Sequence, residues 1–429
     1  MRVYLISICL ITFGWASDQV PAAKQQQPIV LTGATIYPIS GEPIVGGQIL
    51  FSEGRIVELG QRISSPAGAE IIDVAGKEIY PGFILAESNL GLVEIDAVHS
   101  TRDEQEVGDV NPNVIGSRAY NPDSEHIPIT RATGIAIANV VPEGGLLSGT
   151  SSAMLLDAWT VEDALLKVAT GIWLNWPESA VSPGMSAKAR DKKIEAYQKR
   201  LDQLDDIFDR VVAYGKLNAG ASIKQTDFRW TALQPVIERN LPLFIRAEGY
   251  DDILAAVNWT QRRGFKMVLV GGTAAALVSD KLVEREIPVI IRSVHNLPVK
   301  RWAAYSAPAT LAAQLESAGV LFSYVADGDH VERNLPFQAG RAEGFGLSHE
   351  AALRSITLAP AQILNIDDRV GSLEVGKDAT LIVTDGDPLD LRSQVEMMFI
   401  QGREVDLGNR HSTLYEKYRQ RYLQSGRIE

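Results

Sequence analysis

Polar and charged side chains follow several apolar runs in the central part of the chain, where predicted strands end. These side chains are Glu87, Asn89, Arg246, Glu248, Thr273, His295, Asp327 and His330. Carboxylates and imidazoles can act as general acids and bases, and with amide oxygens they can hold a divalent cation. A guanidinium in the same place would instead neutralise carboxylates. The sequence therefore predicts a polar site, with Asp327 as the candidate catalytic group and the other seven residues as candidate binding groups.

The central part of the chain alternates strand and helix signals. Apolar runs at 243–245, 267–270, 288–291 and 320–325 are each followed by a helix-like stretch. This spacing is typical of successive βα units and predicts an α/β fold with a (β/α)8 TIM-like barrel over residues 80–365. The active site of such a barrel lies at the carboxyl ends of its strands. We therefore expect the candidate residues to meet at one mouth, with the insert at 101–128 over it as a lid or rim.

Both ends of the mature chain have short strand-like runs separated by turn signals. We expect residues 29–79 and 366–410 to build one small composite β-sandwich, with the barrel inserted between them. Residues 17–28 would form a linker and residues 411–429 a C-terminal helical tail. The two termini should therefore lie in one unit.

The first residues are typical of a secretory signal peptide. Arg2 precedes a nearly unbroken apolar run at 3–15, and Gly14 and Ala16 fit a small-x-small cleavage site. We expect cleavage after Ala16 and a periplasmic or extracellular protein; the alternative is a cytoplasmic protein with an apolar first helix. The single cysteine, Cys9, lies in this segment, so the mature chain would have no disulfide and no thiolate chemistry.

The charge and hydrophobicity of the chain argue against nucleic acid and membranes as partners. The formal net charge is -12, with 41 Lys and Arg against 53 Asp and Glu. An acidic chain of this kind argues against nucleic acid, which needs basic surfaces. No later segment approaches 18 uninterrupted apolar residues, so no membrane association is expected after signal removal.

Residues 80–89, Tyr-Pro-Gly-Phe-Ile-Leu-Ala-Glu-Ser-Asn, resemble the "Pro-Gly-apolar-apolar-Asp-x-His-x-His" element of the amidohydrolase superfamily. The segment 371–379 is similar to the closing motif of its imidazolonepropionase-like group, and the resemblance extends over roughly 29–407. It implies a hydrolase of non-peptide carbon–nitrogen bonds, in an amide or cyclic amide. Family members hold one or two metal ions, with zinc as the default, that activate water.

The family's ligand positions can be carried over one by one. The first histidine pair falls on Glu87 and Asn89, the histidine of strand five on Arg246 and that of strand six on Gly271. The aspartate of strand eight is present as Asp327, where it would orient or deprotonate water. The resemblance thus implies that the metal-binding histidines are missing, and no metal cofactor is expected. Arg246 would bridge Glu87 and Asp327 in place of the metal; the alternative is a solvated ion-pair network without function.

Two functions remain open at this point. The first is a hydrolase with an unusual metal site or a metal-free mechanism around Asp327, in which His295 and His330 could serve as acid or base. Both histidines could equally be loop residues that only form hydrogen bonds. The second is a catalytically silent relative that binds a small-molecule or peptide-like ligand, or that pairs with an intact homologue in a homo- or hetero-oligomer.

Overall fold

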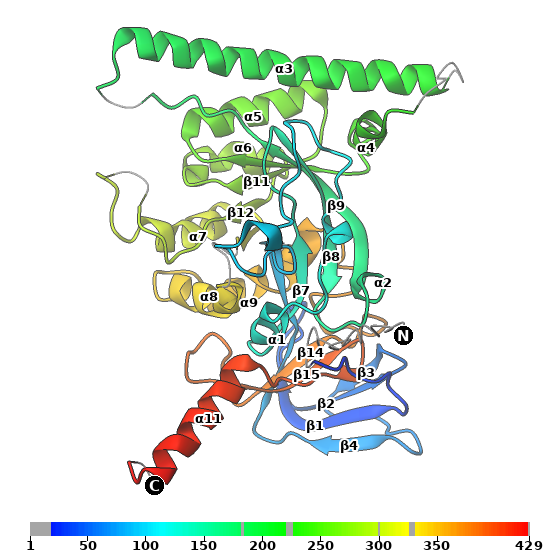
Figure 1. Cartoon of the computed structure of the whole chain (residues 1–429). Coiled ribbons are helices and arrows are strands. Elements are labelled where there is room, and N and C mark those ends of the chain that lie inside the picture. The colour runs from blue at the N-terminus through cyan, green and yellow to red at the C-terminus, as the bar shows by residue number, and fades with distance from the viewer. Residues whose placement is uncertain (1–18, 182–183, 220–225, 299–300, 326–330, 428–429) are drawn as a thin grey trace, which may run out of the picture.

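The computed structural model describes residues 19–427 except 182–183, 220–225, 299–300 and 326–330. The expected signal segment 1–16 and the candidates Asp327 and His330 lie outside these residues. Two sheets organise the chain, a barrel in the middle and a separate sheet at one end (Figure 1). The predicted α/β fold, with a barrel and a unit built from both termini, is confirmed.

The barrel sheet has eight strands that follow one another in space as they do in the sequence. They are β6 (Phe83–Ser88), β7 (Ile135–Val140), β8 (Leu147–Leu155), β9 (Leu165–Asn175), β10 (Leu243–Ala247), β11 (Met267–Gly271), β12 (Val289–Ile291) and β13 (Phe322–Tyr324). The first and last strands lie close together, so the barrel is nearly closed. Its strands are buried almost throughout, as expected when helices cover the outer face.

One strand departs from a regular (β/α)8 pattern. β8 runs antiparallel to both β7 and β9, whereas the other barrel pairs are parallel. The link from β7 is a short turn in which Gly144 and Gly145 take positive φ values of 80° and 66°. A parallel connection would need a crossover of about a dozen residues, so the chain reverses here. As a result, the start of β8 lies beside the carboxyl end of β9, where Leu147 pairs with Leu174.

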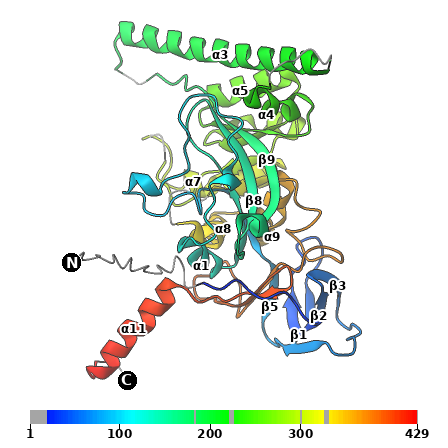
Figure 2. The same ribbon diagram turned by 45° about the vertical axis from the view of Figure 1, so that its right-hand side comes forward.

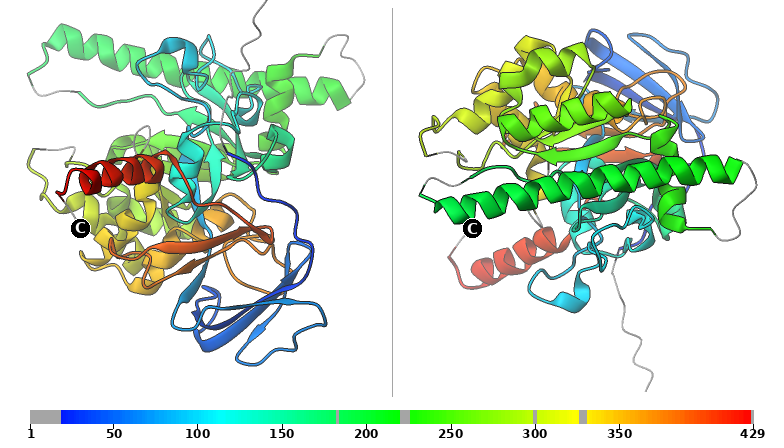
Figure 3. Two further views of the ribbon diagram at one scale, coloured as in Figure 1. Left: turned by 60° about the horizontal axis from the view of Figure 1, so that its bottom comes forward. Right: turned by 90° about the horizontal axis from the view of Figure 1, so that it is seen from above.

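Helices surround the barrel. They are α1 (His126–Arg131), α2 (Val161–Ala164), α3 (Ala187–Ala219), α4 (Phe228–Ile237), α5 (Tyr250–Arg263), α6 (Ser279–Glu284), α7 (Ala307–Ala318), α8 (Leu335–Glu343), α9 (His349–Ser355) and α10 (Leu358–Ile363). Four short 3-10 turns are η1 (His99–Thr101), η2 (Gly116–Arg118), η3 (Ala275–Val278) and η4 (Glu332–Asn334). The long helix α3 lies across one end of the molecule (Figures 1 and 3) and buries Leu204, Phe208 and Val211 against it.

The second sheet joins the two ends of the chain. Its N-terminal strands are β1 (Ile29–Ile36), β2 (Ile44–Ser52), β3 (Arg55–Gly60), β4 (Glu70–Asp73) and β5 (Glu78–Pro81). Its C-terminal strands are β14 (Leu381–Thr384), β15 (Val395–Ile400) and β16 (Arg403–Glu404). β14 pairs antiparallel with β5, and Leu31, Phe51 and Phe399 are buried in a core of this sheet. The two ends therefore build one unit together, as predicted, and its strands form a single sheet.

The chain ends in α11 (Arg410–Gln424), which projects from the body and buries none of its residues (Figures 1 and 2). Asn409 caps it, accepting hydrogen bonds from the backbone amides of His411 and Ser412. Among the described residues, no helix has both the length and the apolar character needed to cross a bilayer.

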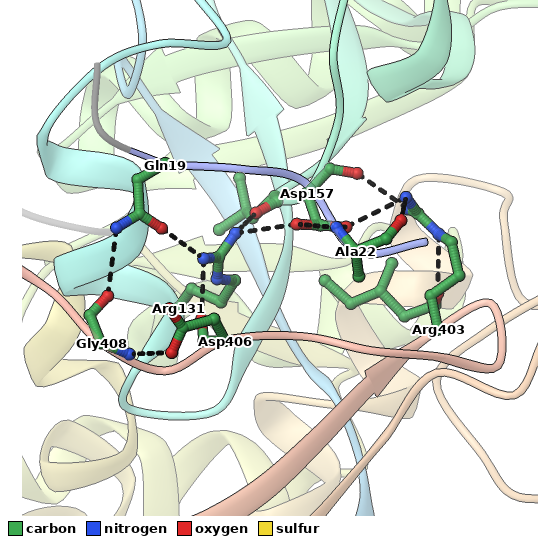
Figure 4. Close-up of polar contacts among 9 residues, drawn as sticks. Gln19, Ala22, Arg131, Asp157, Arg403, Asp406 and Gly408 are labelled. Carbon is green, nitrogen blue, oxygen red and sulfur yellow. Dashed lines mark hydrogen bonds and ion pairs between the residues drawn. The ribbon is translucent and has the colours of Figure 1, made fainter. Parts of the chain in front are cut away.

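A buried ion-pair cluster ties the N-terminal segment to the barrel and to the C-terminal sheet strands (Figure 4). Asp157, just after β8, pairs with Arg131 of α1 at 3.1 Å and with Arg403 of β16 at 3.0 Å. The same carboxylate accepts a hydrogen bond from the backbone amide of Ala22 at 3.2 Å. Arg131 also donates to the carbonyl of Asp406 at 2.8 Å. Segments from three distant parts of the sequence thus meet at one carboxylate.

Candidate functional site

The carboxyl ends of β6, β9 and β10 bring three polar side chains together at the barrel mouth. Arg246 donates from Nε and Nη2 to Oε1 of Glu87, at 3.1 and 2.6 Å. Its Nη1 donates to Oδ1 of Asn175 at 3.2 Å. The expected contact between Arg246 and Glu87 is therefore present, while the third expected member, Asp327, lies outside the described residues.

The surroundings of Arg246 fix its position. Its guanidinium carbon lies 4.5 Å from the ring centroid of Trp173, and this buried ring stacks on Phe244 at 4.9 Å. The side chains of Arg246 and Glu87 are only 24% and 12% exposed. A charge-assisted bond and a cation–π contact in a poorly hydrated place are both stronger than they would be on the surface. Arg246 is thus a fixed positive group at the mouth.

One oxygen of Glu87 has no partner in the described part of the chain. Its Oε2 is buried and, among the residues that the structure describes, receives no hydrogen bond. Leaving a buried carboxylate oxygen unsatisfied is costly. The described residues therefore leave one buried acceptor without a partner in the carboxylate that Arg246 binds.

A second cluster forms after β10 and β11. Glu248 accepts hydrogen bonds from the backbone amide of Thr273, at 3.2 Å, from the Thr273 hydroxyl, and from Nε of Arg292. Gly271 ends β11 with a φ of 91°, and a Cβ there would lie 2.3 Å from Oε1 of Glu248. The Glu248 carboxylate thus occupies the space that a side chain at position 271 would need.

The remaining candidates occupy the loops. Asn89 follows β6, and its carbonyl accepts a hydrogen bond from the amide of Leu92 at 2.8 Å. The backbone amide of His295 donates to Oγ of Ser293 at 3.2 Å. Partial burial, and then the guanidinium of Arg341, lower the pKa of the His295 imidazole below its usual value. His330 lies outside the described residues, so its relation to this loop stays a prediction.

The insert after β6 lies along the rim of the mouth. Val110 and Ile115 form bridges with Leu147 and Thr150 at the start of β8, which is at the mouth end of the barrel. The carboxylate of Asp109 accepts hydrogen bonds from Arg200 and Gln203 of α3. The Arg200 guanidinium is the main reason that the pKa of Asp109 lies below its usual range.

One residue of the mouth was not among the candidates. Asn175 directly follows the buried run Ile172–Leu174, which is the same signal that selected Arg246. Arg292, which follows β12 and bonds to Glu248, is selected by this signal as well. The position directly after a buried strand therefore indicates the polar groups of the mouth, and it could have identified Asn175.

Three side chains that could ligate a metal lie together away from the barrel mouth. Within the described part of the chain, one cluster of three such side chains is close enough to hold an ion: Glu343, His349 and Asp387. None of them is among the sequence candidates. At the mouth, Oε1 of Glu87 and Oδ1 of Asn175 are instead bonded to a guanidinium.

Comparisons with known proteins agree with this architecture. The model of the Amidohydrolase family matches residues 258–407. The chain is 21% identical over 426 residues to Amidohydrolase tasK of Hapsidospora irregularis, covering 88% of this chain and 43% of that protein. It therefore spans less than half the length of this curated relative.

Solved structures show the same likeness over most of the chain. An amidohydrolase from Thermotoga maritima MSB8 superposes with a TM-score of 0.77 at 29% identity, covering 88% of this chain and 99% of that one. A molinate hydrolase superposes with a TM-score of 0.57 at 15% identity, covering 90% and 96%; this second likeness concerns the fold alone. With its barrel, its sheet shared by both termini and these similarities, the chain has an amidohydrolase-like fold.

Proposed function

We propose that this chain is a ligand-binding member of the superfamily: its barrel mouth holds a small amide or cyclic amide and has lost the metal-dependent hydrolysis of carbon–nitrogen bonds. The observation that carries this proposal is the position of Arg246, bonded to Glu87 and Asn175 and stacked on Trp173. By the resemblance to the family, this guanidinium would stand where a catalytic metal lies in other members.

The groups at the mouth do not fit a divalent ion. An arginine has only donors and keeps its charge, so it cannot ligate a cation and repels one. Oε1 of Glu87 and Oδ1 of Asn175 are already bonded to it. A histidine at position 271, where the resemblance places a ligand, would have to displace the Glu248 carboxylate and to adopt the φ of 91° that Gly271 has. These contacts support a site built around an arginine.

The same groups suit an amide. An amide offers a carbonyl oxygen that accepts and an N–H that donates, on adjacent atoms. Arg246 supplies N–H donors, and Oε2 of Glu87 is an acceptor without a partner among the described residues. A ligand that spans both would satisfy this buried oxygen. The pairing favours neutral amides and small cyclic amides over cations.

Hydrolysis would need an activated water. Unassisted water has a pKa far above neutral pH, which a bound metal lowers to about 7. An aspartate such as Asp327 has an ordinary pKa of about 3.9, so alone it is too weak a base to ionise water at neutral pH. The proposed mouth therefore binds amides without cleaving them at an appreciable rate.

The test uses the full mature chain and a panel of hydantoin, dihydrouracil and N-acetyl amino acids. Binding is measured by calorimetry, and hydrolysis by chromatography with EDTA or with added zinc. We expect binding of at least one compound, weakened about tenfold or more by Glu87→Gln because a charge-assisted bond is lost, and no hydrolysis. Zinc-dependent hydrolysis that persists in His349→Ala, which disables the only other described ligand cluster, would contradict the proposal.

A second candidate is a working hydrolase, favoured by the 29% identity to a solved amidohydrolase over 88% of the chain. In this case Asp327→Asn should abolish turnover of the same panel while leaving the fold intact.

We also propose that the protein is exported, as the apolar segment 3–15 before Ala16 suggests. N-terminal sequencing of native protein should then begin near Ser17, and recovery of an intact Met1 would contradict export.

A further inference from the structure

Three side chains that can ligate a metal meet outside the mouth. Glu343 ends α8, His349 begins α9, and Asp387 follows β14. Nδ1 of His349 lies 3.3 Å from Oε2 of Glu343 and 4.0 Å from Oδ2 of Asp387. One ligand atom from each residue lies within 4.8 Å of the other two. The three side chains are 37%, 40% and 43% exposed, so an ion in solution can reach them.

The backbone holds Glu343 and His349 next to each other. The turn between α8 and α9 closes through a hydrogen bond from the amide of Gly346 to the carbonyl of Glu343, at 3.0 Å. Gly346 takes a φ of 103°, which a glycine adopts readily. Ser348 then caps α9 by accepting from the amide of Ala351 at 3.2 Å. A short rigid turn therefore positions two of the three ligands.

Close packing brings in the third ligand. A Cβ at Gly340 of α8 would lie 2.5 Å from the carbonyl oxygen of Leu389, so the loop after β14 rests directly on this helix. Within that loop, Oδ1 of Asp387 accepts a hydrogen bond from the amide of Leu389 at 2.9 Å. This bond orients the carboxylate and leaves Oδ2 for His349, which is how surrounding groups usually hold metal ligands.

The charges in this cluster are not balanced. His349 is the one basic partner that either carboxylate has within the described residues, and no lysine or arginine there pairs with Glu343 or Asp387. A neutral imidazole leaves two negative charges close together, and a protonated one balances a single charge. A divalent cation would balance both and would use the imidazole nitrogen as a ligand.

We propose that Glu343, His349 and Asp387 bind a divalent cation of the zinc class, with water completing its coordination. One nitrogen and two oxygen donors are a set that zinc accepts. Tetrahedral bonds of about 2.1 Å put donor atoms roughly 3.4 Å apart, so the half-exposed carboxylates need only a small rotation inwards. The ion links α8 and α9 of the barrel to the loop after β14. It thereby fastens the barrel to the sheet shared by the termini.

The experiment treats tag-free full-length protein with EDTA, removes the chelator and titrates zinc by calorimetry, with elemental analysis of the dialysed complex. We expect one zinc ion per chain and a higher Tm when zinc is present. His349→Ala and the nearly isosteric Glu343→Gln should each weaken binding about tenfold or more, because each removes one of three protein ligands. Circular dichroism checks that both variants fold.

Two controls make the result specific. His411→Ala changes an exposed histidine on α11 and should leave zinc binding unchanged. Glu87→Gln changes the mouth and should also leave it unchanged, which separates this site from the proposed amide site. Absence of zinc binding, or binding that is unaltered by both His349→Ala and Glu343→Gln, would overturn the proposal.

Discussion

At the scale of single residues, Arg246 has three kinds of partner at once. It bonds to a carboxylate, to an amide oxygen and to the face of a buried tryptophan ring. Each contact uses a different property of the guanidinium: its charge, its fork of N–H groups and its flat face. A lysine shares only the charge, so substitutions at this position can separate the three contributions.

We predict that Arg246→Ala lowers the free energy of unfolding by about 1–3 kcal/mol, because Glu87 then keeps a largely buried charge without its partner. Arg246→Lys should fall between the wild type and the alanine variant, since it keeps the charge but loses the paired N–H bonds and the stacking. Urea denaturation measures both changes. Equal stabilities of all three proteins would show that the pair is hydrated and contributes little.

His295 offers a titration that can be followed directly. Its pKa is lowered first by partial burial and then by Arg341, so the imidazole should be neutral at pH 7 and should take up its proton only below about pH 6.5. NMR of the ring protons measures this value. Arg341→Gln should raise the pKa part of the way to its ordinary value, because burial remains. A lowered folded-state pKa also means that acidification through this range favours unfolding. A pKa above the ordinary value would contradict this account.

The sequence predicted some of these contacts and missed others for identifiable reasons. Glu87 and Arg246 each follow a buried apolar run, so a barrel alone implies that they meet. The possible metal ligands Glu343, His349 and Asp387 have no such signal in the sequence. Glu343 and His349 are close in sequence, but Asp387 reaches them only because the loop after β14 rests on Gly340. A contact of this kind depends on how the loop after β14 packs on α8, and no local sequence pattern shows this packing.

At the scale of elements, β8 shows how link length decides strand direction. The apolar runs predicted barrel strands, and repeated βα spacing suggested that all were parallel. Only residues 141–146 separate β7 from β8, which is too short for a crossover helix. The reversal brings the start of β8 to the mouth, where β8 pairs with the insert. The insert is in turn bonded to α3 through Asp109.

We predict that Asp109→Asn loosens the insert and the first half of α3, because it breaks the ion pair with Arg200. Hydrogen exchange at neutral pH should rise at 105–115 and 187–203 and stay unchanged in β10 and β11. The folded-state pKa of Asp109 is lowered. The ion pair between Asp109 and Arg200 is therefore fully present at a pH above the ordinary aspartate pKa of about 3.9, and it is lost as the pH falls through the folded-state pKa. Exchange that is insensitive to this substitution would mean that other contacts hold the insert.

At the scale of the whole molecule, the two ends of the chain depend on each other. Strand and turn signals at both ends predicted a shared unit, and the pairing of β5 with β14 provides it. The sequence could not give the register of this pairing, nor the ion-pair cluster that links the N-terminal segment, the barrel and β16. Arg131, Asp157 and Arg403 lie in three separate segments, and each alone resembles an ordinary surface charge.

Asp157 should contribute most to the ion-pair cluster that links the N-terminal segment, the barrel and β16. Its side chain is 1% exposed, forms ion pairs with Arg131 and Arg403, and accepts a hydrogen bond from the amide of Ala22. Asp157→Ala leaves two arginines and an amide without their shared acceptor in a buried place, which should cost about 3–5 kcal/mol of unfolding free energy. Asp157→Asn, which keeps one acceptor oxygen, should cost less.

The matched control is Asp390→Ala, which breaks an exposed pair with Arg392 and should change stability little. Chemical denaturation measures the three variants, and limited proteolysis reports the local effect. In Asp157→Ala, cleavage should appear around residues 19–25 before the barrel opens, because the amide of Ala22 has lost its anchor. The opposite result would be that Asp157→Ala and Asp390→Ala lower the free energy of unfolding equally little and that the N-terminal segment stays protected. Apolar packing would then hold the barrel and the terminal sheet together, and the ion-pair cluster would contribute little.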